Sequence, residues 1–503
     1  MKIINHFALL LLFGCAVSCT QPENSISNES IGIIPLPSTY ELKPGTFYIT
    51  GQSSIGIDKS DPEMTALANY FNEEISDATG FSLPVNNSGT IIFQLGEHKE
   101  LGEEGYQLSI SSDQLILSAY KHHGIFNGIQ SVLQLLPPEI KSKTVQADAT
   151  WSINCIEVTD KPQFAWRGLM LDVSRHFFTK QEVKKFIDQM AEYKYNVFHW
   201  HLTDDQGWRL EIKKYPELTL IGGSTEVGGG PGGYYTQEQF KDIVSYAMQR
   251  YVEIVPEFDM PGHTNAALAS YGFLNPNGKK APLYTGTDVG FSSFMAHSEK
   301  TYEFIEDVIK EVVQISPSKY IQIGGDEALN TKKEDYDYFV GRVAKIAQKY
   351  GKIPIGWDPI DTSPEINSSV ILQNWKDSNE EAVKKNMKII VSIASKAYLD
   401  MKYNEKTPYG LDWAGYIPVE TAYKWDVTDY APKNLALGLE APLWTETIST
   451  QEQMDYMIYP RLLGYAEIGW TPKENRNWEE YKMRLEMQEE RLGYEGVNYY
   501  KES

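Results

Sequence analysis

Hydrophobic and polar positions follow two different patterns along the chain, and the change comes near residue 161. Before it, short runs such as Tyr106–Ile110 and Gln114–Leu117 have the apolar spacing and length of β-strands. From Gly124 to Leu136 apolar residues share one helical face, and Pro137-Pro138 ends this pattern. Residues 31–160 are therefore predicted to form a small α+β domain.

After residue 161, apolar stretches of strand length alternate with longer amphipathic segments. Two of these segments open with the pattern of a capping box, at Thr179 with Glu182 and at Thr236 with Gln239. Eight strand-like stretches begin near Gly168, Asn196, Val252, Tyr320, Ile353, Ser369, Lys388 and Leu435. Eight alternations over residues 161–503 predict an α/β fold, a (β/α)8 barrel of the TIM type, with a doubly wound sheet as the alternative.

The N-terminus has the pattern of an export signal. After Lys2, an apolar run extends to Val17, which is too short to span a bilayer and is typical of a signal peptide. Its end, Ala16-Val17-Ser18-Cys19, resembles a bacterial lipoprotein cleavage box, and polar residues 20–30 follow. We expect residues 1–19 to be removed as a lipoprotein signal up to a lipidated Cys19, with residues 20–30 as a tether. Cleavage before Cys15 and plain secretion are the alternatives.

This prediction places the protein outside the cytoplasm, in the periplasm or at the outer membrane or cell surface. The N-terminal lipid would be its only membrane contact. With Cys19 lipidated, Cys155 would be the single thiol of the mature chain, so no intramolecular disulfide is expected.

Composition narrows the classes of partner. The chain of 503 residues has 46 Lys and Arg against 68 Asp and Glu, a net charge of −22, and no local basic stripe. Such a surface repels phosphate backbones, so nucleic acid is not an expected partner. Ten of the eleven tryptophans lie between Trp166 and Trp478, and flat aromatic faces concentrated in one region suit a sugar-binding enzyme.

Polar and aromatic residues crowd the ends of the predicted barrel strands. In a (β/α)8 barrel these ends form the face that carries the active site. The segments are Asp172–His176, His199–Asp205, Pro256–His263, Gly324–Glu327, Gly356–Asp358, Gln373–Trp375, Tyr398–Asp400 and Glu440–Glu446. Carboxylates and tryptophans at nearly every end of one barrel indicate a functional site.

One candidate chemistry is a metal site. His199 and His201 are two residues apart on a strand, so both rings project from the same face, as a pair of metal ligands would. The other histidines of the barrel region that are available as ligands are His176, His263 and His297. Because ligands are scarce, histidines with a structural role in the core are the alternative.

The other candidate is Asp326-Glu327, which follows two glycines. Adjacent residues have Cα atoms only about 3.8 Å apart, so these carboxylates cannot easily flank a sugar ring from opposite faces, and the ordinary arrangement of two glycosidase carboxylates is not expected for this pair. One of them can still protonate a leaving oxygen while its neighbour acts on the other side of the reacting carbon. That second group can act on part of the substrate itself.

At these residues the sequence resembles glycoside hydrolase family 20, the β-N-acetylhexosaminidases. The matching stretches are Arg167–Phe177, His199–Trp208, Pro256–His263, Ile323–Glu327 and Leu443–Glu446. The resemblance covers nearly everything after residue 30 and implies a (β/α)8 barrel preceded by a small α+β domain. It implies an exo-acting enzyme that hydrolyses terminal non-reducing β-linked GlcNAc or GalNAc from glycans with retention, through the substrate's own 2-acetamido group and with neither metal nor cofactor.

The resemblance also assigns roles to individual residues. Glu327 matches the general acid/base, Asp326 the residue that orients and stabilises the acetamido group, and Tyr398 the donor to its carbonyl oxygen. Aromatic walls around the acetamido group are matched by Trp357, Trp375 and Trp444. The remaining sugar-binding positions are Arg175 and Glu446 at the outer hydroxyls, with Asp400 and Trp413 near the 6-hydroxyl. Asp204 and His263 match a pair that lies behind the acid and tunes it.

One position departs from the family. The histidine that usually lies two residues before the Gly-Gly pair is Gln322 here, and an amide cannot carry a proton charge. The departure affects fine tuning, such as the pH optimum, and leaves the reaction class intact.

A sugar-binding lipoprotein that has lost catalysis and a disaccharide-releasing enzyme of the same family are the rival functions. The preferred sugar, the linkage and the oligomeric state are left open.

Overall fold

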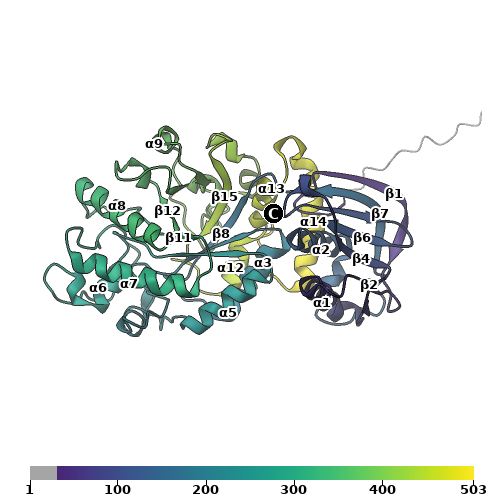
Figure 1. Cartoon of the computed structure of the whole chain (residues 1–503), viewed down its shortest axis with the longest axis horizontal. Coiled ribbons are helices and arrows are strands. Elements are labelled where there is room, and N and C mark those ends of the chain that lie inside the picture. The colour runs from purple at the N-terminus through teal and green to yellow at the C-terminus, as the bar shows by residue number, and fades with distance from the viewer. Residues whose placement is uncertain (1–30, 503) are drawn as a thin grey trace, which may run out of the picture.

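The computed structural model describes residues 31–502, which form a mixed sheet with two long helices and a closed barrel beside it (Figure 1). The predicted signal peptide, the tether and Cys19 lie outside the described residues. Within residues 31–502, no helix is both long and apolar enough to cross a membrane.

The first part is a seven-stranded sheet with the order β1-β7-β5-β6-β4-β2-β3. Its strands are β1 (Thr39–Tyr48), β2 (Ile55–Gly56), β3 (Val85–Asn86), β4 (Ile91–Leu95), β5 (Tyr106–Ile110), β6 (Leu115–Ala119) and β7 (Ser152–Asp160). Helices α1 (Pro62–Thr79) and α2 (His122–Leu135) cover the face that is turned toward the barrel (Figure 1). The predicted strands and the predicted helix of this region are therefore confirmed.

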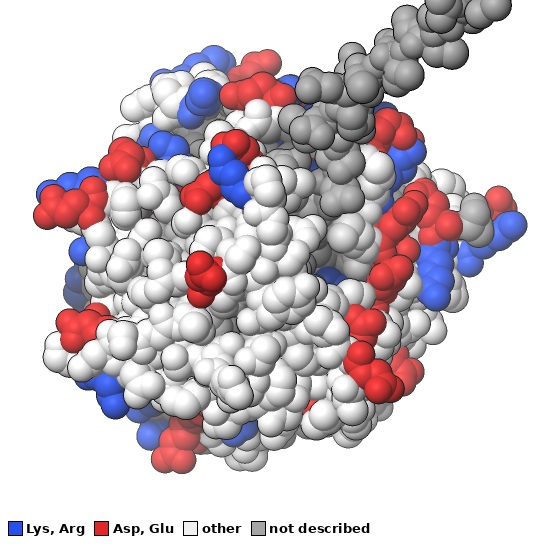
Figure 2. Space-filling model, turned by 90° about the vertical axis from the view of Figure 1, so that its right-hand side faces the viewer, with Lys and Arg blue, Asp and Glu red and all other residues white. Residues whose placement is uncertain are grey.

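The opposite face of this sheet is open to solvent. Along β5, Tyr106, Leu108 and Ile110 are buried, while Gln107 and Ser109 between them are partly exposed. Alternation of this kind is expected for a sheet with one packed and one solvated face. Figure 2 views the molecule from this side, where charged residues ring a centre that is poor in charge.

The second part is a closed barrel in which β8 to β15 follow one another in chain order and all pairs are parallel. The strands are β8 (Trp166–Asp172), β9 (Val197–His201), β10 (Glu253–Glu257), β11 (Tyr320–Gln322), β12 (Ile353–Trp357), β13 (Ile371–Asn374), β14 (Ile389–Val391) and β15 (Ala436–Leu443). The predicted (β/α)8 barrel is confirmed, and closure excludes the doubly wound sheet.

Helices surround the barrel. The longer ones are α3 (Lys180–Glu192), α5 (Gln237–Met248), α7 (Glu299–Ile315), α8 (Lys333–Lys349), α13 (Arg461–Trp470) and α14 (Trp478–Glu495). The shorter ones are α4 (Glu217–Leu220), α6 (Asn265–Ser270), α9 (Glu380–Lys384), α10 (Ala394–Ala397), α11 (Val419–Tyr423) and α12 (Gln451–Ile458). Both predicted capping boxes are present, at the starts of α3 and α5.

The barrel interior contains a polar layer in place of the aliphatic side chains that usually fill it. Its members are 1% exposed or less and come from five different strands: His199, Glu257, Gln322, Gln373 and Glu440. Buried polar and charged groups are costly unless they are paired. Each of these side chains has hydrogen-bond partners within the barrel, so the layer forms a connected network directly beneath the strand ends.

Candidate active site

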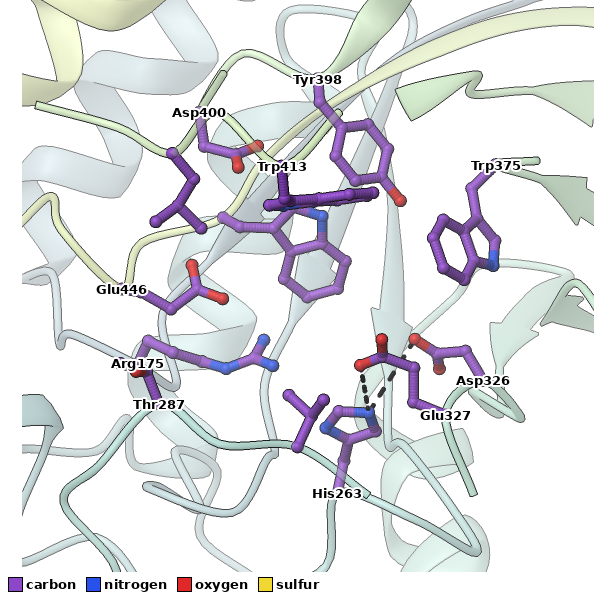
Figure 3. A pocket seen from close by; sticks show the side chains of 13 residues that line it. Arg175, His263, Thr287, Asp326, Glu327, Trp375, Tyr398, Asp400, Trp413 and Glu446 are labelled. Atoms are coloured by element: carbon purple, nitrogen blue, oxygen red, sulfur yellow. Dashed lines mark ion pairs between the residues drawn. The ribbon is translucent and has the colours of Figure 1, made fainter. Parts of the chain in front are cut away.

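A cavity of about 280 Å³ opens at the carboxyl ends of the barrel strands, on the face where the sequence places the functional residues (Figure 3). Ten of the predicted site residues line it: Arg175, His263, Asp326, Glu327, Trp375, Tyr398, Asp400, Trp413, Trp444 and Glu446. Thr287, Val289 and Leu411 complete the lining. Side chains that are up to 271 positions apart in the sequence thus meet around one space.

The turn after β11 carries the two adjacent carboxylates. Gly324 and Gly325 have φ angles of +69° and +108°, and Glu327 also lies in the left-handed region at +41°. A Cβ at Gly324 would lie 1.7 Å from Asp259 Oδ1, so only glycine fits there. For a residue with a side chain, this backbone conformation persists only where its surroundings impose it, and it is typical of functional sites.

A buried imidazole lies behind the predicted acid. His263 Nε2 is 3.5 Å from Glu327 Oε2 and 4.0 Å from Asp326 Oδ2, and its Nδ1 is 3.1 Å from Asp204 Oδ1. Burial opposes the charged ring, but Asp204 and Asp259 outweigh it and hold the pKa of His263 well above its ordinary value. A protonated His263 therefore lies within ion-pair distance behind the carboxylates of Asp326 and Glu327, and Asp204 keeps it in place.

Asp326 lies deeper in the cavity than Glu327. Burial, followed by the neighbouring Glu327, raises the pKa of Asp326, and the charge of His263 works against this rise. Its Oδ1 is buried and has no hydrogen-bond partner among the described residues. A buried acceptor without a partner is unusual, and Asp326 lines the cavity, where its carboxylate can accept an N–H from a ligand.

The opposite end of the cavity is also polar. Arg175 Nη2 is 2.9 Å from Asp204 Oδ2, and the guanidinium lies over the Trp444 ring with 4.9 Å between Cζ and the ring centroid. Burial raises the pKa of both Glu446 and Asp400. Glu446 Oε2, Arg175 Nε and both carboxylate oxygens of Asp400 lack partners within residues 31–502. Such a group of unsatisfied acceptors beside an arginine suits a ligand with several hydroxyls.

Aromatic rings close the remaining sides. Trp375 and Trp444 line the cavity, and Trp413 lies edge-on to Trp375 and to Tyr398, with ring centroids 6.0 and 5.9 Å apart. Trp413 is 57% exposed and therefore lies at the mouth. Flat apolar faces of this kind pack against the C–H faces of a sugar.

Trp357 lies in a different place from the other predicted aromatic walls. It is fully buried and does not line the cavity. Its Nε1–H donates to Glu257 Oε1 at 2.7 Å, and its ring packs 5.9 Å from that of Trp444. Trp357 therefore supports Trp444 from beneath, and Asp204, which also does not line the cavity, supports His263 and Arg175.

His199 belongs to the polar layer, and His201 lies two residues further along β9. The ring nitrogens of His199 bond Glu440 at 2.7 Å and Glu257 at 2.8 Å, and those of His201 bond Glu257 and Asp204. Burial opposes protonation, but Glu440 and Glu257 raise the pKa of His199 to about 9, and Glu257 with Asp204 raises that of His201 well above its usual range. All four ring nitrogens thus have carboxylate partners, which fits the alternative of core histidines.

Two other triads bring possible ligand atoms within 4.8 Å of one another: Asp204, Asp259 and His263, and His263, Asp326 and Glu327. Both depend on His263, whose Nδ1 faces Asp204 and whose pKa is raised. The donor set is therefore better suited to holding a proton than a cation.

Some residues in or beside the site were not singled out from the sequence. Glu257 and Asp259 lie in the Pro256–His263 segment, so their place at a strand end was a usable signal. Thr287 and Val289 come from a long loop without any periodic pattern, and no feature of the sequence marks them.

Family sequence models and related protein sequences assign the chain to the same family. Residues 164–337 and 328–473 match the sequence model of glycosyl hydrolase family 20, catalytic domain, and residues 30–161 match that of glycosyl hydrolase family 20, domain 2. The chain is 34% identical over 469 residues to a beta-N-acetylhexosaminidase of Cellulomonas fimi, with 90% of this chain and 93% of the relative covered. A beta-hexosaminidase of Porphyromonas gingivalis is 34% identical over 530 residues, with 98% and 67% covered.

Solved structures agree. The GH20 beta-N-acetylhexosaminidase of Streptomyces coelicolor A3(2) is similar with a TM-score of 0.91 and 42% identity, covering 94% of this chain and 98% of its own. The N-acetyl-beta-hexosaminidase of Streptomyces plicatus, solved with Thio-NAglucal, has a TM-score of 0.91 and 43% identity, covering 94% and 97%.

Proposed function

The chain belongs to glycosyl hydrolase family 20, and from this premise we propose that it is an exo-acting β-N-acetylhexosaminidase. It removes terminal non-reducing β-linked GlcNAc or GalNAc from glycans with retention of configuration. The observation that carries this proposal is the placement of Asp326 and Glu327 as neighbours on one strained turn, both facing a cavity that is lined by aromatic rings.

The geometry suits catalysis in which the substrate supplies the nucleophile. The acetamido oxygen attacks the anomeric carbon and forms the ring of an oxazolinium ion, while the bond to the leaving oxygen breaks and Glu327 gives that oxygen its proton. Because the nucleophile is tethered, it avoids most of the entropic cost of a bimolecular attack. Water then opens the ring at the same carbon and gives a proton back to Glu327, so the configuration is retained.

Asp326 and Tyr398 act on the acetamido group during this step. The carboxylate of Asp326, which lines the cavity, accepts the acetamido N–H and stabilises the positive charge that develops on the ring. Burial keeps the pKa of Tyr398 well above its ordinary value, so its hydroxyl remains protonated and donates to the carbonyl oxygen. The two groups thus hold the acetamido group in the orientation that the attack needs.

The cavity favours release of single sugars. Arg175 and Asp400 line the cavity and are almost completely buried, which suits the binding of hydroxyls of one terminal sugar. A disaccharide-releasing enzyme would need room for a second sugar. A binding protein without catalysis is not favoured either, because Glu327, Asp326 and Tyr398 all converge on the cavity.

The test of this function is Glu327→Gln, measured on two substrates. Hydrolysis of an alkyl β-N-acetylglucosaminide, whose leaving group must be protonated, should fall by roughly 10²–10⁴-fold, the usual contribution of a general acid. An activated aryl glycoside should lose less, because its leaving group departs with little help. Equal losses on both substrates would show that Glu327 is not the acid.

For the location, we propose export and attachment to a membrane through a lipid on Cys19. The support is the sequence of residues 1–19 alone. A Cys19→Ala variant should move from the detergent-extracted membrane fraction to the soluble fraction. If the wild-type protein is already in the soluble fraction, the lipid attachment is wrong and the protein is simply secreted.

A further inference from the structure

Gln322, the residue at which this chain departs from the family pattern, has a defined set of partners in the structure. It closes β11, is 1% exposed and lies inside the barrel. The residues that follow it are Ile323, the two glycines of the turn and then the pair Asp326-Glu327. Whatever fixes Gln322 therefore also fixes the start of the turn that carries both carboxylates.

The oxygen and the NH₂ group of the Gln322 amide have different hydrogen-bond partners. Its Oε1 accepts from the backbone N–H of Ile323 at 3.0 Å and of Gly324 at 3.1 Å, while its Nε2 donates to Gln373 Oε1 at 2.8 Å. Backbone N–H groups can only donate, so the amide oxygen must face the turn and the NH₂ must face Gln373. The orientation of this amide is thus determined by its neighbours.

Gln373 continues the chain of hydrogen bonds in the same direction. Its Nε2 donates to Glu440 Oε1 at 2.5 Å and to Ser392 Oγ at 3.1 Å. Glu440 is fully buried and also accepts from Trp166 Nε1 at 3.0 Å, which holds it at the start of the barrel. The turn is therefore connected through two amides to a fixed carboxylate on β15.

The same carboxylate anchors the other connection to Glu327. Glu440 Oε1 is 2.7 Å from His199 Nδ1. His199 is the first member of a series of buried histidines and carboxylates that contact one another. That series continues through Glu257, His201, Asp204 and His263, and reaches Glu327 Oε2 at 3.5 Å. Two separate routes, one through Gln322 and the main chain and one through His263, thus lead from one anchor to one carboxylate.

We infer that Gln322 is a positioning residue for the general acid: it holds the Gly324–Gly325 turn so that Glu327 meets His263. The inference rests on the proposed function of Glu327. The turn needs such support because its two glycines leave the backbone free to adopt other conformations, while Glu327 is held at a positive φ that a residue with a side chain keeps only where its surroundings impose it. An amide serves because one acceptor and one donor are required at fixed places, and no charge is needed.

The decisive variant is Gln322→Met, which keeps the length of the side chain and removes both hydrogen-bonding ends. We expect kcat to fall about 10- to 100-fold, the usual cost of a misplaced catalytic group, with KM little changed. The loss should be greater on an alkyl β-N-acetylglucosaminide than on an activated aryl one, because only the former depends fully on the acid. Loss of stability alone would not create this difference.

Gln189→Met is the matched control. Gln189 is also a buried glutamine, on α3, and donates to Asp455 Oδ1 at 2.8 Å, but it does not line the cavity. Its variant should lose stability without loss of kcat. Gln322→His should recover most of the activity that Gln322→Met loses, because a neutral imidazole has one acceptor and one donor nitrogen.

The inference is overturned if Gln322→Met keeps the wild-type kcat, or if its loss is the same for both leaving groups. If that variant does not fold, Gln322→Asn replaces it. The shorter amide cannot reach the turn and Gln373 together, so a wild-type kcat in it would also overturn the inference. A wild-type enzyme that is inactive on both glycosides would instead contradict the proposed function, so the two failures are distinguishable.

Discussion

Tyr398→Phe separates catalytic from structural hydrogen bonding at this site. Tyr398 is 3% exposed and follows α10, and its hydroxyl points into the cavity (Figure 3). The variant loses only the proposed donor to the acetamido oxygen. A hydrogen bond to a group that becomes charged contributes about 1.5–3 kcal/mol, so kcat should fall by roughly 10- to 150-fold. Because the hydroxyl faces the cavity, the free energy of unfolding should hardly change.

Tyr195→Phe is the matched control, for which we expect a loss of stability without a loss of activity. The Tyr195 hydroxyl is buried away from the cavity and donates to the carbonyl oxygen of Leu462 at 2.6 Å. Its loss should lower the free energy of unfolding by about 1 kcal/mol and leave kcat unchanged. Denaturant unfolding and steady-state kinetics on an aryl β-N-acetylglucosaminide would measure both quantities. The reasoning is refuted if Tyr398→Phe keeps the wild-type kcat, or if its stability falls as much as that of Tyr195→Phe.

Further predictions concern metal and pH. Prolonged chelation should leave activity unchanged, because both nitrogens of His199 and of His201 are bonded to carboxylates; a loss that zinc restores would revive the metal site. The raised pKa of His199, about 9 against 6.5, contributes stability that is complete below pH 6.5 and is lost as the pH rises through 9. Its size is about 3 kcal/mol. Denaturant midpoints between pH 6 and 10 should therefore fall, and a rise would contradict the assignment of charges in the polar layer.

The fold was predictable from the sequence because eight largely apolar stretches of strand length alternate with amphipathic helices. The positions of Asp326 and Glu327 followed from their place at a strand end. The polar layer was not predictable, because the partners of His199 are Glu257 and Glu440, which are 58 and 241 residues away in the chain. Two histidines at metal-like spacing look the same in sequence whether their partners are ions or carboxylates.

The burial of Trp357 could not be predicted from the sequence either. Trp357 and Trp375 both lie at the ends of predicted strands, but Trp357 is the last residue of β12, while Trp375 comes after β13, so one supports the cavity from beneath and the other lines it. Roles that depend on a partner from a distant strand therefore require the folded structure. The role of Gln322 belongs to the same class, since its partner Gln373 is 51 residues away.

The central claim, that the acetamido oxygen of the substrate is the nucleophile, is tested most directly by changing that group. Fluorine atoms on the acetyl methyl withdraw electrons from the carbonyl oxygen without altering the leaving group. On aryl glycosides with no, one, two and three fluorines, kcat should fall stepwise, and a β-glucoside with a 2-hydroxyl should be turned over almost undetectably. A kcat that is independent of fluorination, together with a glycosyl ester trapped on a carboxylate of the barrel, would show that the protein supplies the nucleophile.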